Sequence, residues 1–317
     1  MIDTTTLGTN GPTVGRIGLG CMGMSWVYDE QNRDETTSIK VIHEALDSGA
    51  TLIDTADMYG PFDNEYLVGR ALAGRRDDAV LATKGGLIVD GARNLHRNGR
   101  PEHLRAALDA SLLRLRTDHV DLYQLHRVDP AVPLAETWGA MAELVAAGKA
   151  RAIGLSEADP AQIREAHALH PVTSVQSELS LWTPDVLAEV LPLTEELGIA
   201  LIPFSPLGRG FLAGRFTSPD DLPAGDWRHG NPRFQADAMA QNQRIAAVVR
   251  EQAGLLGVTP AQLALAWVLA QGRFVVPIPG TKNPVYLRDN LAAASVRIPA
   301  EVLTVLDGLP AAAGRRY

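Results

Sequence analysis

The chain has 317 residues, of which 46% are hydrophobic and 21% are charged, a composition typical of a globular protein with a large apolar core. Its formal net charge of -8 argues against a general nucleic-acid binder. The single cysteine, Cys21, excludes an internal disulfide and a cysteine-rich metal site, which favours a reducing cytoplasm.

The chain shows no targeting or membrane segment. The first residues, MIDTTTLGTNGP, lack the basic and apolar regions of a signal peptide. The most apolar stretch, LALAWVLA at 263–270, is too short to cross a bilayer and predicts a buried helix. We therefore expect a cytoplasmic protein with neither a membrane nor a nucleic acid as partner.

Short apolar runs alternate with amphipathic stretches along the chain, and several of the amphipathic stretches open on a proline, as helices do. The predicted strands are 16–19, 51–54, 79–83, 120–125, 150–155, 172–176, 199–203 and 274–276. The predicted helices are 34–48, 64–73, 101–115, 133–147, 160–169, 184–197, 238–256 and 284–294. This repetition predicts an α/β fold, a parallel (β/α)8 TIM barrel.

Three segments fall outside the repeat. A short β-hairpin, TTTLGTNGPTVGRIG, precedes the first strand, a long insertion at 208–237 follows the seventh, and an extra helix is predicted at 299–309. No linker or shift in composition divides the chain, so we expect a single barrel domain over 1–317.

The stretch GLGCMG, Gly18 to Gly23, matches the glycine pattern of a Rossmann dinucleotide-binding fold. In that fold a helix opens inside the motif, whereas here a helical pattern begins only near Asp34. The acidic residue at the end of the next strand should follow after roughly 20 residues, and Asp54 lies further on. Both observations favour a glycine-rich loop at the mouth of a barrel.

Three neighbouring predicted strands end in polar residues that suit catalysis. Asp54 ends the second strand in LIDTADMYG, Lys84 the third in LATKGG, and His126 the fourth in VDLYQLHRV. Residues two apart share a face of a strand, so these side chains continue the inward rows of the barrel. Tyr59 lies on the loop after the second strand. The carboxyl ends of barrel strands form one face, so we expect the four side chains to meet there.

The chemistry of such a cluster is coherent. A buried ammonium favours the phenolate and would lower the pKa of Tyr59, while Asp54 would keep Lys84 charged. His126 would hydrogen-bond a substrate oxygen, so that the cluster suits carbonyl reduction or its reverse. Taken singly, each residue has an ordinary role as a cap, a solvated side chain or a packing group, and only their convergence favours a site. Asp57, in the loop, receives no catalytic role.

Over nearly its whole length the sequence resembles the aldo-keto reductases, with closest similarity to bacterial members and the potassium-channel β-subunit branch. The blocks that carry the resemblance, in order, are GLGCMGMS, LIDTADMYG, LATKGG, VDLYQLHRVD, GKARAIGLSE, VQSELSLW, FSPLGRGFLAG and PIPGTKNPVYLRDNL. The resemblance implies Tyr59 as general acid, supported by Asp54, Lys84 and His126. It also implies hydride transfer from a reduced nicotinamide cofactor, without a metal and without a Rossmann fold.

The resemblance also implies cofactor contacts at the remaining strand ends. Ser156 and Gln176 would hydrogen-bond the nicotinamide carboxamide, although a helix cap and a solvated strand end are their ordinary alternatives. Phe204 would stack on the nicotinamide, where many members have a tyrosine. The stretch SPLGRG would hold the pyrophosphate, through Ser205, Leu207 and Arg209.

The stretch GTKNPVYLRDN after the last strand would bind the adenosine end of the cofactor. A helix begins near Pro284, and helix N-termini bind phosphate. The implied contacts are Gly280, Thr281, Lys282, Asp289 and Asn290. Lys282 favours NADPH/NADP+, but Asn283 stands where many relatives have a second basic residue, and Arg288 is an alternative cation. The use of NAD therefore stays open.

The substrate is the least defined part of the prediction. Loop aromatics that could line a pocket, or simply pack, are Trp26, Tyr28, Trp182 and Trp227. We expect an alcohol dehydrogenase of the NADP+ type that reduces small aldehydes and ketones to alcohols. The alternative is a regulatory subunit that binds NADPH as a redox sensor with little turnover. The physiological substrate, the favoured direction and the oligomeric state are left open.

Overall fold

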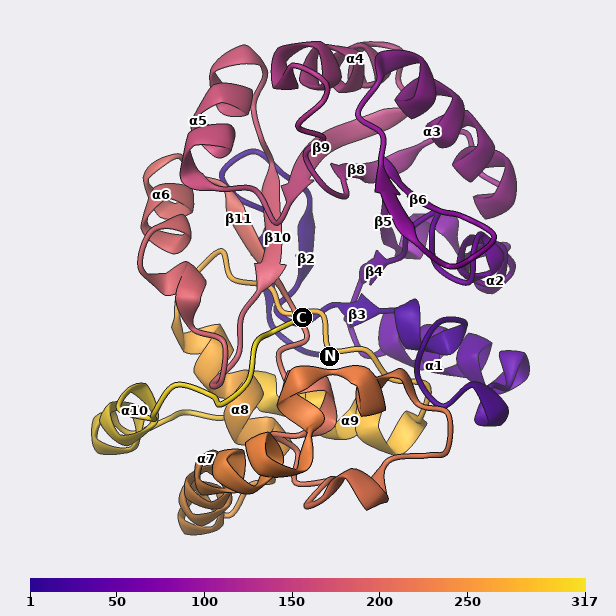
Figure 1. The fold of residues 1–317 in the computed structure, drawn as a ribbon. Coiled ribbons are helices and arrows are strands. Elements are labelled where there is room, and N and C mark those ends of the chain that lie inside the picture. Colours follow the sequence, from indigo (N-terminus) through magenta and orange to yellow (C-terminus); the bar gives the residue numbers. More distant parts are fainter.

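The barrel is built from parallel strands that follow one another along the chain. The structure, a computed structural model, describes residues 1–317, and its central sheet has seven parallel strands that curve into a ring (Figure 1). In sheet order they are β3 (Leu19–Gly20), β4 (Leu52–Asp54), β5 (Val80–Gly85), β8 (Val120–Leu125), β9 (Ala150–Ser156), β10 (Ser174–Glu178) and β11 (Ala200–Phe204). The predicted TIM-barrel architecture is confirmed.

The eighth side of the barrel is an extended segment instead of a regular strand, so the prediction of a strand at 274–276 is wrong in detail. Isolated parallel bridges join Leu201 to Val275 and Gly20 to Gly280. The segment thus lies between β11 and β3 and closes the ring. Its sequence, VVPIPG, contains two prolines that have no N–H to donate, which prevents a continuous ladder of hydrogen bonds.

The helices surround the barrel, as Figure 1 shows. They are α1 (Glu35–Asp47), α2 (Asp63–Ala71), α3 (Pro101–Leu115), α4 (Leu134–Ala146), α5 (Pro160–Leu169), α6 (Val190–Glu196), α7 (Ala236–Leu256), α8 (Pro260–Ala270), α9 (Pro284–Ala292) and α10 (Ala300–Asp307). The predicted helix at 184–197 splits into a 3-10 turn, Asp185–Leu187, and α6. Pro192 explains the break, since a proline is tolerated only in the first turn of a helix.

Helix α8 confirms the buried helix predicted from the stretch LALAWVLA. It starts at a capping box between Thr259 and Gln262, and nearly all of its residues are buried. No single helix of the chain is long and apolar enough to cross a membrane, although α7 and α8, which meet at 93°, together have the length and composition of one.

Two hairpins and an insertion complete the fold. The predicted N-terminal hairpin is formed by β1 (Thr4–Thr6) and β2 (Thr13–Gly15), and its Leu7 and Val14 pack into the interior of the barrel. A second hairpin, β6 (Leu87–Val89) with β7 (Leu95–Arg97), was not predicted. The insertion after β11 carries the 3-10 turns Gly208–Gly210, Pro219–Asp221, Trp227–Gly230 and Pro232–Phe234.

The interior of the barrel is apolar at one depth and polar at the next. Leu52, Ala82 and Leu122 belong to the apolar cluster that fills the barrel. Two residues further along the same strands lie Asp54, Lys84 and the buried amide of Gln124. The two-residue period of β-strands therefore carries these polar groups inward, at the carboxyl end of the barrel.

A buried ion pair between Glu65 and Arg114 joins helices α2 and α3 of the outer layer. Glu65 Oε2 accepts from Arg114 Nε at 2.6 Å, and Glu65 Oε1 accepts from Thr83 Oγ1 at 2.6 Å. Glu65→Gln should lower the free energy of unfolding by about 2–4 kcal/mol, because it leaves the guanidinium buried without a counter-charge. Urea denaturation measures this loss.

The matched control is Glu143→Gln, which breaks the exposed ion pair of Glu143 with Arg105. That change should cost less than about 1 kcal/mol. Equal losses in the two variants would contradict a stabilising role for burial of the Glu65 pair.

Candidate active site

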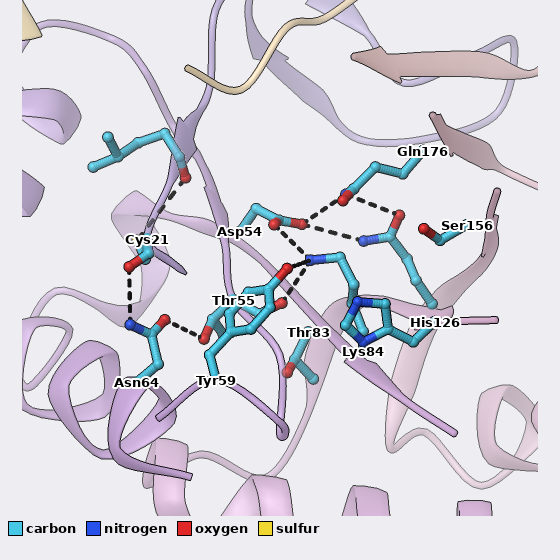
Figure 2. A network of polar contacts seen from close by, with 12 residues as sticks. Cys21, Asp54, Thr55, Tyr59, Asn64, Thr83, Lys84, His126, Ser156 and Gln176 are labelled. Atoms are coloured by element: carbon cyan, nitrogen blue, oxygen red, sulfur yellow. Dashed lines mark hydrogen bonds and ion pairs between the residues drawn. The ribbon is translucent and has the colours of Figure 1, made fainter. Parts of the chain in front are cut away.

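Four predicted side chains meet at the carboxyl end of the barrel, with Lys84 at the centre (Figure 2). Lys84 Nζ donates to Asp54 Oδ1 at 2.6 Å and to the Thr55 carbonyl at 2.9 Å, and lies 3.4 Å from Tyr59 Oη. Lys84 is fully buried, and the exposed fractions of Asp54, Tyr59 and His126 are 3%, 8% and 6%. The prediction that these four side chains lie together is therefore confirmed.

The second oxygen of Asp54 is held by two amides that come from other strands. Asp54 Oδ2 accepts from Gln176 Nε2 at 2.9 Å and from Gln124 Nε2 at 3.3 Å. Both oxygens of the carboxylate are therefore satisfied, which is what a buried charge requires. Sequence reasoning did not assign Gln124 a role; its inward position two residues after Leu122 was the available signal.

Burial and charge act in opposite directions on Lys84 and Tyr59. Burial alone would lower the pKa of Lys84, but Asp54 and Tyr59 outweigh it and the pKa is raised, so the lysine is charged. Burial raises the pKa of Tyr59, and the opposing effect of Lys84 does not cancel it. The prediction of a lowered phenol pKa is therefore wrong in this structure, because desolvation of the phenolate exceeds its stabilisation by the ammonium. Tyr59 holds its proton and can donate it.

His126 is a neutral imidazole beside Tyr59. Burial lowers its pKa well below the ordinary value, and the charges of Lys84 and Arg127 lower it further. The rings of His126 and Tyr59 meet edge to face with centroids 5.8 Å apart. Nδ1 of His126 is buried and has no hydrogen-bond partner in the protein. A neutral histidine can donate one hydrogen bond to an oxygen held next to Tyr59.

The loop that carries Tyr59 is fixed by Asn64, which sequence reasoning missed. Asn64 Oδ1 accepts from Thr55 Oγ1 at 2.7 Å, and Asn64 Nδ2 donates to the Cys21 carbonyl at 2.9 Å (Figure 2). The amide thus joins both ends of the loop to the segment after β3. Cys21 lies in this network through its backbone, and burial raises the pKa of its thiol.

The residues predicted to hold the nicotinamide lie at the ends of β9, β10 and β11. Ser156 Oγ accepts from Arg127 Nη1 at 3.0 Å, while Gln176 donates to Asp54. Phe204 is partly buried at the end of β11. Figure 2 shows Gln176 and Ser156 on the same side of the cluster as His126. Gln176 and Ser156 therefore border the tetrad of Asp54, Tyr59, Lys84 and His126.

The loop predicted to hold the pyrophosphate has an unusual backbone. Ser205, Gly208 and Arg209 have φ angles of 49°, 54° and 57°, in the left-handed region, which non-glycine residues rarely occupy. Leu207 lies within this loop and is partly buried. The side chain of Arg209 is engaged elsewhere: it forms two hydrogen bonds of 3.0 and 2.9 Å with the buried carboxylate of Glu178.

The C-terminal tail contacts the same region. It returns from α10 toward the barrel and ends at the strand ends (Figure 1). Arg316 pairs with Glu157, directly after β9, and its Nε lies 3.4 Å from Glu178 Oε2. The ring of Tyr317 lies 5.2 Å from the guanidinium of Arg209. The carboxylates at the ends of β9 and β10 are thus neutralised by arginines.

The segment predicted to bind the adenosine end leads into α9. Gly280 bridges to Gly20, and a Cβ added to Gly20 would lie 2.9 Å from the Ile278 carbonyl, so this close approach needs glycine. The half-buried Lys282 donates to the Asp29 carbonyl at 2.8 Å. Thr281 Oγ1 accepts from the Asn283 amide at 3.1 Å.

Asn283 is the N-cap of α9, with Oδ1 accepting from the Val285 amide at 2.8 Å, which explains an asparagine at this position. The two residues predicted at the adenine differ from each other. Asp289 accepts from Thr259 Oγ1 and, at 2.8 Å, from Gln262 Nε2, so it holds the start of α8. Asn290 is 3% exposed.

Of the four aromatic residues predicted to line a pocket, one packs near Tyr59, two contact each other, and one lies in the core. Trp26 packs against the apolar cluster that contains Tyr59. Tyr28 and Trp227 are partly buried and meet edge to face, with centroids 5.9 Å apart. Trp182 is only 1% exposed and stacks on Phe211 in the core, so the structure places it away from a pocket surface.

Comparison with known proteins agrees with the geometry. Residues 16–310 match the model of the aldo/keto reductase family. A relative described as a probable aldo-keto reductase 1, from Glycine max, is 43% identical over 320 residues, covering 100% of this chain and 92% of its own.

Two solved structures share the architecture. A glycerol dehydrogenase from Gluconobacter oxydans has a TM-score of 0.84 at 29% identity, covering 96% of this chain and 94% of its own. An aldo/keto reductase from Klebsiella pneumoniae, solved with NADP and acetate, has a TM-score of 0.73 at 27% identity, covering 96% and 95%.

Asp57, in the loop before Tyr59, gives a prediction for the pH dependence of stability. Burial, with Glu65 nearby, raises the pKa of its carboxyl to about 8, and its Oδ1 has no hydrogen-bond partner. The folded state keeps this proton between about pH 4 and pH 8 while the unfolded chain releases it, so stability falls as pH rises through that window. Asp57→Asn should therefore gain stability relative to wild type as pH rises.

The gain should be about 3 kcal/mol larger near pH 7.5 than near pH 5, because one pKa unit corresponds to ~1.4 kcal/mol and both pH values lie between the unfolded and folded pKa of Asp57. Urea denaturation of both proteins at the two pH values measures it. The exposed Asp77→Asn is the control and should show no such change. A difference between Asp57→Asn and wild type that is independent of pH would refute a protonated Asp57.

Proposed function

This chain belongs to the aldo/keto reductase family and is an oxidoreductase, and from that premise we propose that it reduces aldehydes and ketones to alcohols with NADPH, with Tyr59 as the general acid. The observation that carries the proposal is the contact of Tyr59 Oη with Lys84 Nζ, itself held by Asp54. It combines a protonated phenol with a fixed positive charge at the point where a carbonyl oxygen would become an alkoxide.

In the proposed reaction each of the four residues has a different role. His126 donates a hydrogen bond to the substrate oxygen and orients it. Lys84 stabilises negative charge as it develops on that oxygen and on the phenol, while Asp54 keeps the lysine charged. Tyr59 then gives its proton to the oxygen. A bound reduced nicotinamide would supply the hydride to the carbonyl carbon.

The residues suit such a cofactor by their chemistry. The close approach of Gly20 and Gly280 leaves no room for side chains, and the backbone of the SPLGRG loop presents amides in left-handed conformations, as anion-binding loops do. We propose that Ser156 and Gln176 bind the carboxamide, Phe204 stacks on the ring, and this loop binds the pyrophosphate. Arg209 would join it by sharing its charge with Glu178.

The adenosine end would lie at the start of α9. Lys282 would bind the 2′-phosphate beside Thr281 and the helix N-terminus, with Asn290 and Asp289 toward the adenine. In the Klebsiella pneumoniae relative the bound cofactor is NADP, which supports the choice of NADPH. Use of NAD remains an outcome of the tests below.

The first test replaces the proposed acid. Tyr59→Phe should lower kcat for an aldehyde such as 4-nitrobenzaldehyde by roughly 10²–10⁴-fold, because the proton donor is lost, while the dissociation constant of NADPH stays near the wild-type value. Steady-state kinetics and fluorescence titration measure the two quantities. Tyr66→Phe, the same change at an exposed position on α2, is the matched control and should leave both unchanged.

Three outcomes separate the hypotheses. Normal turnover by Tyr59→Phe would exclude Tyr59 as the acid. Tight NADPH binding by the wild type without turnover of any aldehyde would favour the redox-sensing subunit. Loss of turnover with retained NADPH binding, in Tyr59→Phe alone, supports the reductase.

The second test addresses cofactor choice. Lys282→Met should raise KM for NADPH by roughly 10–100-fold, because a charge-assisted contact to the 2′-phosphate is lost, and should change KM for NADH little. Arg288→Met is the control, since Arg288 is exposed and paired with Glu44. A parallel rise of both KM values in Lys282→Met would show that Lys282 does not read the 2′-phosphate.

A further inference from the structure

Arg127 is a guanidinium at the tetrad that the reaction described above does not use. It follows His126 directly at the end of β8 and is partly buried. Its Nη1 donates to the His126 carbonyl at 2.6 Å and to Ser156 Oγ at 3.0 Å. Its Nε and Nη2 make no hydrogen bond within the protein, and no carboxylate lies within ion-pairing distance.

Three other cations at the mouth of the barrel have a counter-charge. Lys84 is paired with Asp54, Arg209 with Glu178, and Arg316 with Glu157. These pairs use up the carboxylates at the ends of β4, β9 and β10. Arg127 therefore keeps an uncompensated positive charge in a partly desolvated position, which is costly unless a ligand supplies the negative charge.

A second cation strengthens the positive potential. Arg97, on the exposed strand β7, donates to the Val128 carbonyl at 3.1 Å, one residue after Arg127, and it too has no carboxylate partner. Burial lowers the pKa of Arg127, Tyr317 and Tyr59 oppose this shift, and the charge of Arg97 adds to it. An anion entering from this side meets two arginines without an ion-pair partner. The buried Asp129 is the acid near Arg97, and its carboxylate accepts from the backbone amides of Gly99 and Ala131.

The orientation of Arg127 fits one kind of anion. Two acceptors fix Nη1, so that the fork of the guanidinium is held in place and its Nε–Nη2 edge stays free. Two parallel N–H groups on one edge match the two oxygens of a carboxylate, which arginine binds in bidentate fashion. Arg127 follows His126 directly and contacts Ser156 at the next strand end, and its charge lowers the pKa of both Tyr59 and His126.

We propose that Arg127 is a substrate-binding residue, and that the preferred substrates are carbonyl compounds that also bear a carboxylate, which its free edge binds while the carbonyl oxygen lies between Tyr59 and His126. This rests on the proposed carbonyl reduction. The phosphates of the cofactor are the rival anions, but the loop proposed to hold the pyrophosphate follows β11, and Lys282 follows the extended segment that closes the ring. Arg127 follows β8, the fourth strand of the sheet.

The test compares isosteric substrates that differ in charge. Initial rates with NADPH are measured for 2-, 3- and 4-carboxybenzaldehyde against the corresponding methylbenzaldehydes, so that three separations of carboxylate and carbonyl are sampled. For at least one isomer, wild-type kcat/KM should be roughly 10–100-fold higher for the carboxylate. In Arg127→Gln this ratio should fall to near one, and in Arg127→Lys to an intermediate value. The ratio is insensitive to losses common to both substrates.

Arg97→Gln is the matched control, because it removes a neighbouring positive charge that does not touch Ser156. It should reduce the ratio by less than about threefold at physiological salt. Thermal unfolding of each variant shows whether the fold is kept. Equal efficiency of both substrates in the wild type, or an equal loss on both in Arg127→Gln, overturns the proposal. A higher NADPH dissociation constant in Arg127→Gln with an unchanged ratio assigns Arg127 to the cofactor and also overturns it.

Binding measurements separate this proposal from the proposed reaction. Calorimetric titration of the enzyme saturated with NADP+ compares benzoate with benzyl alcohol in wild type and Arg127→Gln. Tighter binding of benzoate that depends on Arg127 supports the carboxylate site even without turnover of any aldehyde. Absence of that dependence overturns it, whatever the rates.

Discussion

The buried ion pair between Asp54 and Lys84 is the constraint on which the site depends. Both charges lie out of water inside the barrel, and their separation of 2.6 Å offsets only part of that cost. The remaining cost is met by the Thr55 carbonyl on one partner and by two glutamine amides on the other. Each of these groups comes from a barrel strand or its end, so the rigidity of the sheet fixes the charge next to Tyr59.

This dependence explains why so much of the site could be predicted from the sequence. The barrel interior repeats every two residues, so an apolar residue at one position implies an inward side chain two residues later. Asp54, Lys84 and Gln124 each follow an interior apolar residue in this way. Because neighbouring strands of a parallel barrel end on one face, their order along the chain was enough to bring these residues together.

The features that could not be predicted depend on side-chain packing and burial. Nothing in the sequence indicates that Arg209 turns to Glu178, or that Asn64 joins the ends of the Tyr59 loop, because both follow from rotamers set by distant segments. The predicted direction of the Tyr59 pKa shift was wrong for a related reason. The sequence shows the charge of Lys84, which lowers the pKa, but it does not show the larger effect of burial, which raises it. The eighth strand and the helix at 184–197 differ locally, and prolines explain both.

Net charge describes this protein poorly at the scale of its site. The chain carries a formal charge of -8, yet the carboxylates at the ends of β4, β9 and β10 are each matched by a lysine or arginine. A cation left over after this pairing acts in a partly desolvated region, where its field is screened less than at the surface. The proposed binding of anionic ligands at the mouth of the barrel therefore depends on which local charges are paired, and less on the excess of acidic residues elsewhere on the chain.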